Sequence, residues 1–204
     1  LDPAFDEHEL TTRLADLAHH VPSAAPPTTV LPPPRPSSEQ GRLVAVTGPG
    51  GGGASHAAIA LAQGLATARG KLPRRDGRVG SSRRPSVLLA DLCRDADQAL
   101  YHDASDRAPG LPELVDTHRT GRPTTSQALD HTFDVPARGY RLLLGMRQPQ
   151  QWVRLRSQAV ISTLDTLQWL ADVLVADVER DVEGEPETGS IDVQDRHLLA
   201  RSVL

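Results

Sequence analysis

Short apolar runs alternate with amphipathic stretches from residue 42 onward. Four of these runs are apolar at successive positions, which is typical of strands buried on both faces of a parallel sheet. They cover residues 42–47, 87–91, 140–145 and 173–177. The stretches between and after them predict helices at residues 54–68, 111–119, 124–131, 157–171 and 192–203. Strands that alternate with helices predict an α/β fold, a three-layer sandwich with a mainly parallel sheet.

The first 40 residues have a different pattern. Apolar residues recur at roughly helical spacing over residues 5–20 and predict a short amphipathic helix. Residues 21–40 contain seven prolines, which exclude a continuous helix or a central strand. We therefore expect residues 1–40 to be a short helix and a Pro-rich linker, mostly disordered, ahead of an ordered domain at residues 41–204.

Composition and charge narrow the function classes. The net charge of −4 argues against electrostatic nucleic-acid binding, and the basic loop 71–86 lacks the aromatic residues that stack on bases. The single cysteine, Cys93, excludes an internal disulfide and a cysteine-based zinc site. No apolar stretch approaches the roughly 20 residues of a membrane helix, so we expect a cytoplasmic protein without an integral membrane segment.

A glycine-rich segment follows the first predicted strand. Residues 48–55 read Gly-Pro-Gly-Gly-Gly-Gly-Ala-Ser and fit the phosphate-loop spacing G-x-x-x-x-G-K-[ST], except that Ala54 replaces the lysine. The backbone N–H groups of such a turn, with the positive end of the following helix, bind anions. We therefore expect nucleotide phosphates over this loop and a magnesium ion on the Ser55 hydroxyl. The candidate binding residues are Gly48, Gly50, Gly51, Gly52, Gly53, Ala54, Ser55 and His56.

Two other interpretations of the loop remain open. A glycine-rich turn can simply pack a strand against a helix. Gly48, Gly50 and Gly53 also satisfy the dinucleotide-binding pattern G-x-G-x-x-G, which requires an acidic residue about 20 residues further on, at the end of the second strand. Asp91 ends that strand too far along the chain, and Asp76 lies in the basic loop. The dinucleotide interpretation is therefore the weaker one.

Two predicted strands end in an aspartate. The run Val-Leu-Leu-Ala-Asp ends at Asp91, and Val-Leu-Val-Ala-Asp ends at Asp177. In a parallel sheet both residues lie at the carboxyl edge, which also carries the glycine loop. There an aspartate can hold a magnesium ion or orient a water molecule that attacks a phosphate. A turn or helix-capping role is the alternative for each of them.

The order of these motifs resembles the MinD/ParA group of deviant Walker ATPases, and within it the CpaE- and Ssd-like actinobacterial branch. The resemblance covers roughly residues 42–204. It implies a P-loop NTPase-like fold, ATP and Mg²⁺ as ligands, and a homodimer as one assembly. It also implies that residues 48–55 are the Walker A loop, that Asp91 is the catalytic residue linked to water activation, and that Asp177 is the Walker B acid.

The chain departs from this family at two lysines and at its end. The family's signature lysine corresponds to Pro49, the general P-loop lysine corresponds to Ala54, and the chain stops before the family's later strands. We therefore expect a degenerate ATP site and a regulatory or positioning role, in cell division, partitioning, or pilus or secretion assembly. Two alternatives remain. One is an active ATPase in which Arg94 or Arg147 replaces the lysines, and the other is an interaction module that binds no nucleotide.

Overall fold

The structure is a computed structural model that describes residues 40–68, 84–106, 108–180 and 202–203. The predicted helix at residues 5–20 lies outside these ranges, as do residues 21–39 and most of the basic loop. The predicted helix at residues 192–203 also lies outside them, apart from residues 202–203, which are in a turn. None of the described helices has the length and apolar character that a membrane span requires.

Within the described residues, five strands form one sheet in the order β1-β5-β2-β4-β3. Their bounds are β1 Arg42–Val46, β2 Val87–Asp91, β3 Phe133–Val135, β4 Tyr140–Leu143 and β5 Val173–Asp177. The pairs β1–β5, β5–β2 and β2–β4 are parallel, and β3 runs antiparallel to β4. The predicted α/β class with a mainly parallel sheet is therefore confirmed.

The prediction that the first strand is buried on both faces is wrong. Within the described residues β1 pairs only with β5 and lies at the edge of the sheet. Arg42 and Ala45 are exposed and the other three residues are half-buried. In contrast, β2 and β5 lie inside the sheet and are buried at every position. An apolar run predicts a strand, but not its place in the sheet.

The apolar pattern did not predict β3, the short antiparallel strand. A tight turn joins it to β4, with the N–H groups of Arg138 and Gly139 donating to the Val135 carbonyl at 3.0 and 2.9 Å. Gly139 has a φ of 81°, which glycine adopts without strain. Three residues are too few for alternation to stand out from the surrounding loop.

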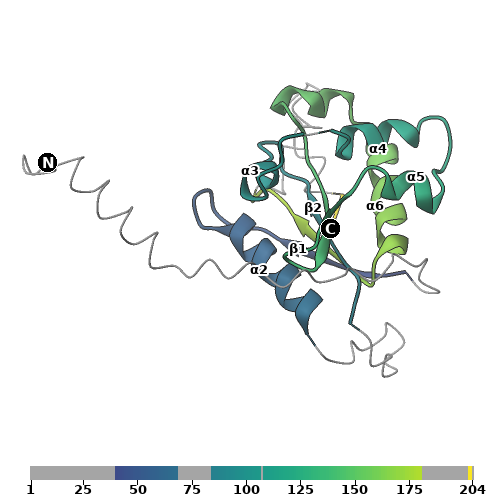
Figure 1. The fold of residues 1–204 in the computed structure, drawn as a ribbon. Helices are drawn as coiled ribbons and strands as arrows, with labels where there is room; N and C mark the ends of the chain where they lie inside the picture. Colours follow the sequence, from purple (N-terminus) through teal and green to yellow (C-terminus); the bar gives the residue numbers. More distant parts are fainter. Residues whose placement is uncertain (1–39, 69–83, 107, 181–201, 204) are drawn as a thin grey trace, which may run out of the picture.

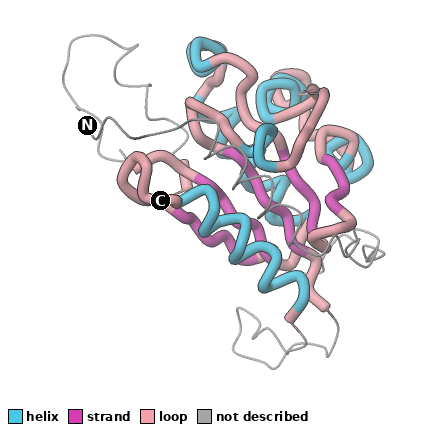
Figure 2. Tube along the Cα trace, turned by 60° about the vertical axis from the view of Figure 1, so that its left-hand side comes forward, coloured by secondary structure: helices cyan, strands magenta, loops and turns pink. Residues whose placement is uncertain are grey.

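Helices cover both faces of the sheet (Figure 1). Helix α2 (Ala54–Thr67) lies on one face, and Figure 2 shows it running along the strands. Three helices lie on the other face, namely α4 (Leu111–Thr117), α5 (Thr125–Leu129) and α6 (Ser157–Leu170). The short helix α3 (Gln98–Tyr101) and the 3₁₀-helix η1 (Pro149–Arg154) were not predicted.

Each face of the sheet has its own core, because successive strand residues point to opposite sides. On one side, α2 packs against the sheet through Ala58, Ala62, Ala66, Val87, Leu89, Val173 and Val175. On the other, α4 and α6 pack through Leu114, Leu164, Leu167, Leu88, Ala90, Leu174 and Ala176. The alanines of α2 let its backbone lie close to the sheet, which fixes the first turn of α2 beside the strand ends.

The described chain packs on the domain from residue 40. Gln40 Nε2 donates to Asp165 Oδ1 at 2.8 Å and to Gln168 Oε1 at 2.9 Å, both on α6. The Gly41 N–H donates to the Gln168 carbonyl at 2.7 Å, and a Cβ at Gly41 would overlap the Ala171 carbonyl. The strand β1 is therefore anchored at its start, and the loop that follows it has a fixed origin.

Candidate functional site

The strand ends and the glycine loop meet at one edge of the sheet. Asp91 ends β2 and Asp177 ends β5, and the two residues are register partners in adjacent parallel strands. Val46, the last residue of β1, is the register partner of Asp177 on its other side. The loop at residues 48–55 follows β1 directly, so both carboxylates lie at the edge where the loop begins.

The loop leaves space above its glycines. A Cβ built at Gly50, Gly51 or Gly53 would meet nothing within 4 Å. Gly51 and Gly53 have φ angles of 76° and 79°, in the region that favours glycine. Gly52 differs, because a Cβ there would lie 2.8 Å from the Pro49 carbonyl oxygen. Backbone conformation thus favours glycine at Gly51 and Gly53, and no other residue packs against the positions where their side chains would lie.

The first turn of α2 follows Gly53 without a protein cap. Gly53 offers no side-chain hydrogen bond to the helix, and the first turn holds no acidic residue. The N–H groups at a helix N-terminus carry partial positive charge and attract anions. Ala54 is half-buried, and a Cβ at Gly48 would lie 3.3 Å from the Ala54 methyl. The turn contains no lysine, and its backbone N–H groups supply a positive potential.

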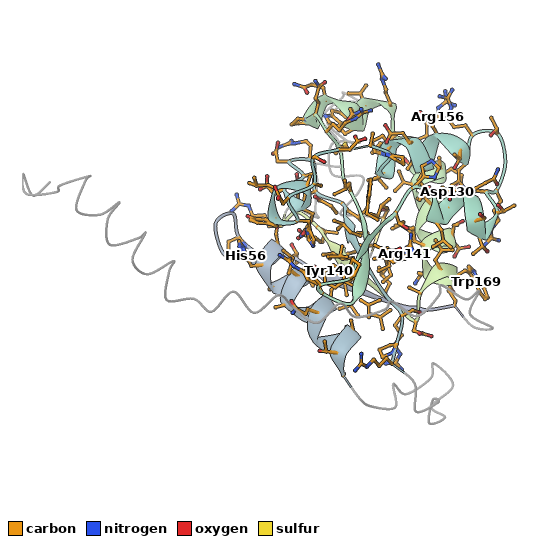
Figure 3. The ribbon with its side chains drawn as sticks, viewed as in Figure 1. His56, Asp130, Tyr140, Arg141, Arg156 and Trp169 are labelled. Atoms are coloured by element: carbon orange, nitrogen blue, oxygen red, sulfur yellow. The ribbon has the colours of Figure 1, made fainter. Side chains whose placement is uncertain are left out.

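His56 lies at the outer end of this turn (Figure 3). Its side chain is exposed, and its ring centroid lies 4.5 Å from that of Tyr101 on α3, with the rings tilted by 59°. This is within the range of favourable aromatic contacts. The His56 ring thus connects the first turn of α2 to α3 through its contact with Tyr101.

The Asp91 carboxylate is 1% exposed and is held by backbone donors. Its Oδ1 accepts from the Cys93 N–H at 3.1 Å, and its Oδ2 accepts from the Gln98 N–H at 3.0 Å. Burial raises the pKa of Asp91 to about 7, the charge of Asp177 adds to this, and the two backbone hydrogen bonds oppose it. A carboxyl that titrates near neutral pH can hold or release a proton at this edge of the sheet.

The Asp177 carboxylate is 2% exposed and is only partly satisfied. Its Oδ2 accepts from Gln98 Nε2 at 2.8 Å. Burial raises the pKa of Asp177, and side-chain contacts with Gln98, Ser55 and Cys93 oppose the rise. Among the described residues, no donor with hydrogen-bond geometry reaches Asp177 Oδ1, although this atom is buried. A buried carboxylate oxygen without a donor is open to a cation.

Gln98 connects the parts of the site and was not singled out from the sequence. It is fully buried. Its backbone binds Asp91 and its amide nitrogen binds Asp177, while the same nitrogen lies 3.5 Å from the Ser55 carbonyl oxygen. The only available signal is its place seven residues after a strand-ending aspartate, at the start of a helix too short to show a period. This linkage depends on tertiary packing, and local sequence does not reveal it.

A polar chain continues from Gln98 into the core. His102 Nδ1 lies 2.7 Å from the Gln98 carbonyl oxygen, and its Nε2 lies 2.7 Å from the Tyr140 hydroxyl. Because a carbonyl can only accept, Nδ1 carries the proton and Nε2 accepts from Tyr140. Arg138 Nη2 donates to the Tyr101 carbonyl at 3.0 Å. These contacts hold α3, and with it Gln98, against β4, where Tyr140 lies at the centre of Figure 3.

Cys93 also lies at this edge of the sheet. Its thiol donates to the Asp177 carbonyl oxygen at 3.6 Å, and it follows Asp91 by two residues. From the sequence, Cys93 bears only on disulfides and cysteine-based zinc sites. Its spacing after a strand-ending aspartate is the signal that could have placed it beside the acids.

The two arginines considered as lysine replacements have acidic partners. Arg94 Nη2 lies 3.3 Å from Asp95 Oδ2, and its backbone N–H donates to Glu179 Oε1 at 2.9 Å. Arg147 Nη2 lies 2.7 Å from Glu113 Oε1. Both guanidinium groups are therefore engaged by carboxylates other than the strand-end pair.

Comparisons with known proteins identify the fold. No protein-family model matches the sequence, and no curated protein matches it significantly. Among solved structures, a ParA family ATPase from Chlorobium tepidum is similar, with a TM-score of 0.55 and 15% identity over 70% of this chain and 53% of that chain. A plasmid partition protein from Borrelia burgdorferi has a TM-score of 0.50 and 16% identity over 79% of this chain and 62% of that chain. A plasmid partition protein from Borrelia burgdorferi B31, solved with AMPPNP bound, has a TM-score of 0.50 and 16% identity. The match covers 79% of this chain and 60% of that chain.

These similarities concern architecture. The protein has the α/β fold of ParA-type P-loop ATPases, with the glycine loop after β1 in the described sheet. At 15–16% identity the likeness establishes the fold and not the activity. The chain spans 53% to 62% of the length of these structures.

Proposed function

We propose that this chain binds the phosphates of ATP over residues 50–55, with Mg²⁺ at Ser55 and Asp177, and that Asp91 orients an attacking water. Turnover is absent or very slow in this proposal. The protein acts as a regulatory or spatial-positioning partner, of the kind found in partitioning, cell division or pilus and secretion assembly. Its assembly state in the proposal is a homodimer, and its ordered domain begins near residue 41.

The observation that carries the proposal is the exposed glycine turn, with left-handed backbone at Gly51 and Gly53, directly before an α2 terminus that has no side-chain cap. A Cβ at Gly50, Gly51 or Gly53 would meet nothing within 4 Å, which leaves room for a ligand but is also true of the exposed helical Gly64. Backbone N–H groups around such a space favour a phosphate.

The acidic edge fits Mg²⁺. This cation takes oxygen ligands and is usually held by one or two carboxylates together with substrate phosphates. Asp177 has one buried oxygen without a donor, and the Ser55 side chain contacts the same carboxylate. When bound, Mg²⁺ would neutralise part of the phosphate charge. Ser55 and Asp177 would hold it, and Gln98 would keep the Asp177 carboxylate in position.

The missing lysines support slow turnover. Removing one pre-placed charge donor typically lowers the rate by about 10²–10³. Ala54 and Pro49 occupy both lysine positions inferred from the resemblance, and the nearest arginine candidates are paired with other carboxylates. We expect turnover of the isolated protein to stay well below about one per second. Ala54→Lys, alone or with Pro49→Lys, should strengthen ATP binding.

The regulatory or positioning role is a fold-level analogy. The neighbours named above are ATPases and partition proteins by description, and one of them was solved with AMPPNP. An interaction module without nucleotide is the competing function, and it makes the opposite prediction for titration with ATP.

The experiment compares two identical substitutions. Gly50 and Gly64 are both exposed, and at both a Cβ would meet nothing within 4 Å. Neither has a positive φ, so alanine fits at both without strain. Gly64 lies within α2, away from the loop. We expect Gly50→Ala to weaken binding of ATP with Mg²⁺ by about tenfold or more, equivalent to about 1.4 kcal/mol, while Gly64→Ala binds like the natural protein.

Isothermal titration calorimetry and a phosphate-release assay give the readouts. Unchanged affinity in a folded Gly50→Ala variant would contradict the loop assignment. No binding by the natural protein at millimolar ATP would favour the interaction module. Hydrolysis at about one per second or faster would contradict the degenerate site and revive the arginine alternative.

A further inference from the structure

Three potential ligand side chains converge beneath the loop. One ligand atom each from Asp91, Cys93 and Asp177 lies within 4.8 Å of the other two. Asp91 and Asp177 are buried, and Cys93 is partly exposed. The loop after β2 returns past the end of β5, which brings the thiol to within 3.6 Å of the Asp177 carbonyl oxygen. The thiol thus belongs to the same small region as the carboxylates.

An unsatisfied atom in this cluster points to a missing positive partner. Asp177 Oδ1 is buried, and no donor among the described residues reaches it with hydrogen-bond geometry, although the Ser55 and Cys93 side chains contact this carboxylate and oppose the rise in its pKa. Gln98 Oε1 is also buried without a donor among the described residues. Leaving a buried acceptor unpaired typically costs about 1–3 kcal/mol, and more for a charged group. A cation bound to the carboxylate would remove this penalty.

The donor set selects the kind of cation. Mg²⁺ takes oxygen ligands in octahedral geometry and has little affinity for sulfur. Zn²⁺ accepts cysteine sulfur at about 2.3 Å and carboxylate oxygen at about 2.0–2.2 Å in a tetrahedral site. We propose that Asp91, Cys93 and Asp177 form a binding site for a thiophilic divalent cation of the Zn²⁺ class, with water at the fourth position. A single cysteine suffices because carboxylates supply the other protein ligands.

The site can close with small movements. Two ligand atoms on one tetrahedral zinc lie about 3.5 Å apart, and those of the cluster now lie within 4.8 Å. The backbone and Gln98 hold the two carboxylates, whereas the half-buried Cys93 thiol is held only by a 3.6 Å contact with the Asp177 carbonyl oxygen. Closing the site would require the sulfur to move toward the carboxylates by about 1 Å, from a separation of at most 4.8 Å to about 3.5 Å. The thiol proton leaves to solvent as the metal–sulfur bond forms.

This site goes beyond the proposed nucleotide function. It needs neither ATP nor the glycine loop. It shares Asp177 with the proposed Mg²⁺ position and Asp91 with the proposed water-orienting role, so the thiophilic cation and Mg²⁺–ATP compete for the Asp177 carboxylate. A metal-loaded protein therefore binds Mg²⁺–ATP more weakly than the metal-free protein.

The experiment uses Co²⁺ as a spectroscopic probe on the full chain, freed of metal by chelation and without nucleotide. Coordination of a thiolate gives a sulfur-to-cobalt charge-transfer band in the near ultraviolet, which carboxylates and histidines do not produce. We expect one Co²⁺ per chain with this band and its loss on adding Zn²⁺. Cys93→Ser should abolish the band and weaken Zn²⁺ binding at least tenfold, and Asp177→Asn should weaken both. Circular dichroism and thermal unfolding show whether each variant is folded.

Two outcomes would overturn the proposal. One is the absence of the band in the natural protein at millimolar Co²⁺. The other is a band of unchanged intensity and affinity in folded Asp177→Asn, which would indicate a thiol-only complex. Gly50→Ala should keep full Co²⁺ binding. Because that variant separates the two sites, a failure of nucleotide binding would leave this result intact, and the reverse also holds.

Discussion

The glycine loop and the acidic strand ends meet at one edge of the sheet but are built in opposite ways. The loop is largely exposed, and three of its glycines face positions with no neighbour within 4 Å. Below it, Asp91, Gln98 and Asp177 are at most 2% exposed and bind one another. The loop is shaped by backbone conformation, whereas the acidic edge is shaped by buried side chains. We therefore expect substitutions in the loop to change ligand binding and those at the acidic edge to change stability as well.

The largest expected effect is a loss of stability as the pH rises. Folding raises the pKa of Asp91 from 3.8 to about 7, mainly through burial. Between these values the folded state holds a proton that the unfolded state has lost. Stability from this group is therefore full below about pH 4 and falls by at most about 1.4 kcal/mol per pH unit, about 4 kcal/mol in all, until about pH 7. Burial raises the pKa of Asp177 too and acts in the same direction.

Urea denaturation at several pH values measures this slope. Asp91→Asn removes the titrating group and should flatten the slope. The matched control is Asp103→Asn. Asp103 is exposed and has a φ of 50°, a conformation that asparagine tolerates. If Asp91→Asn kept the full slope, the acidic edge would not be the source of the pH dependence.

The second-largest effect on stability should come from removing the Gln98 amide, which donates a hydrogen bond to Asp177. Gln98→Met keeps the length of the side chain and the backbone N–H, but removes the donor 2.8 Å from Asp177 Oδ2. A buried carboxylate that loses its donor should destabilise the protein by about 3 kcal/mol at pH 8. The loss should shrink as the pH falls, because the raised pKa of Asp177 favours its neutral form. Gln158→Met on the exposed side of α6 is the control, expected within about 0.5 kcal/mol of the natural protein. Equal stability of both variants at pH 8 would mean that water or another group replaces the amide.

Gly145 tests the packing around Asp91. A Cβ there would lie 2.6 Å from the Ala96 methyl and 2.9 Å from both Cγ and the backbone oxygen of Asp91. Gly145→Ala should therefore destabilise the protein by about 2 kcal/mol, as overpacking typically does. Thermal or urea unfolding measures this, with Gly50→Ala as the same substitution in the loop. Similar losses in both variants would remove the contrast between the two regions.

The sequence predicted those parts of the fold that rest on long local patterns. The runs ending at Asp91 and Asp177 are apolar at each preceding position, so their burial and the shared edge of their carboxylates followed from parallel pairing. The position of β1 at the edge of the described sheet did not follow, because its apolar run looks like that of an inner strand. Burial of a strand depends on which neighbours it has, and no local pattern records that.

Only those parts of the candidate site that form recognisable sequence motifs could be predicted. The glycine loop and the two aspartates carry recognisable spacing, but Gln98 and Cys93 do not. Gln98 lies in a four-residue helix, α3, and reaches Asp177 only after the sheet and α3 have packed. Cys93 joins the acids because the chain turns back after β2. Contacts between residues 79 and 84 positions apart arise from topology, which the local sequence does not encode.

The smallest expected effects on stability are those of two glycine-to-alanine substitutions, and they test most directly whether the loop binds a ligand. Gly64→Ala in α2 should raise stability by about 0.5–1 kcal/mol, because alanine loses less backbone entropy than glycine in a helix. Gly50→Ala should stay within about 0.5 kcal/mol of the natural protein, since its methyl meets no other atom. Adding ATP with Mg²⁺ should then raise the melting temperature of the natural protein and Gly64→Ala, but raise that of Gly50→Ala much less. A ligand-free Gly50→Ala variant as destabilised as Gly145→Ala would show that the loop is a packed structural turn, and the space over its glycines would no longer support phosphate binding.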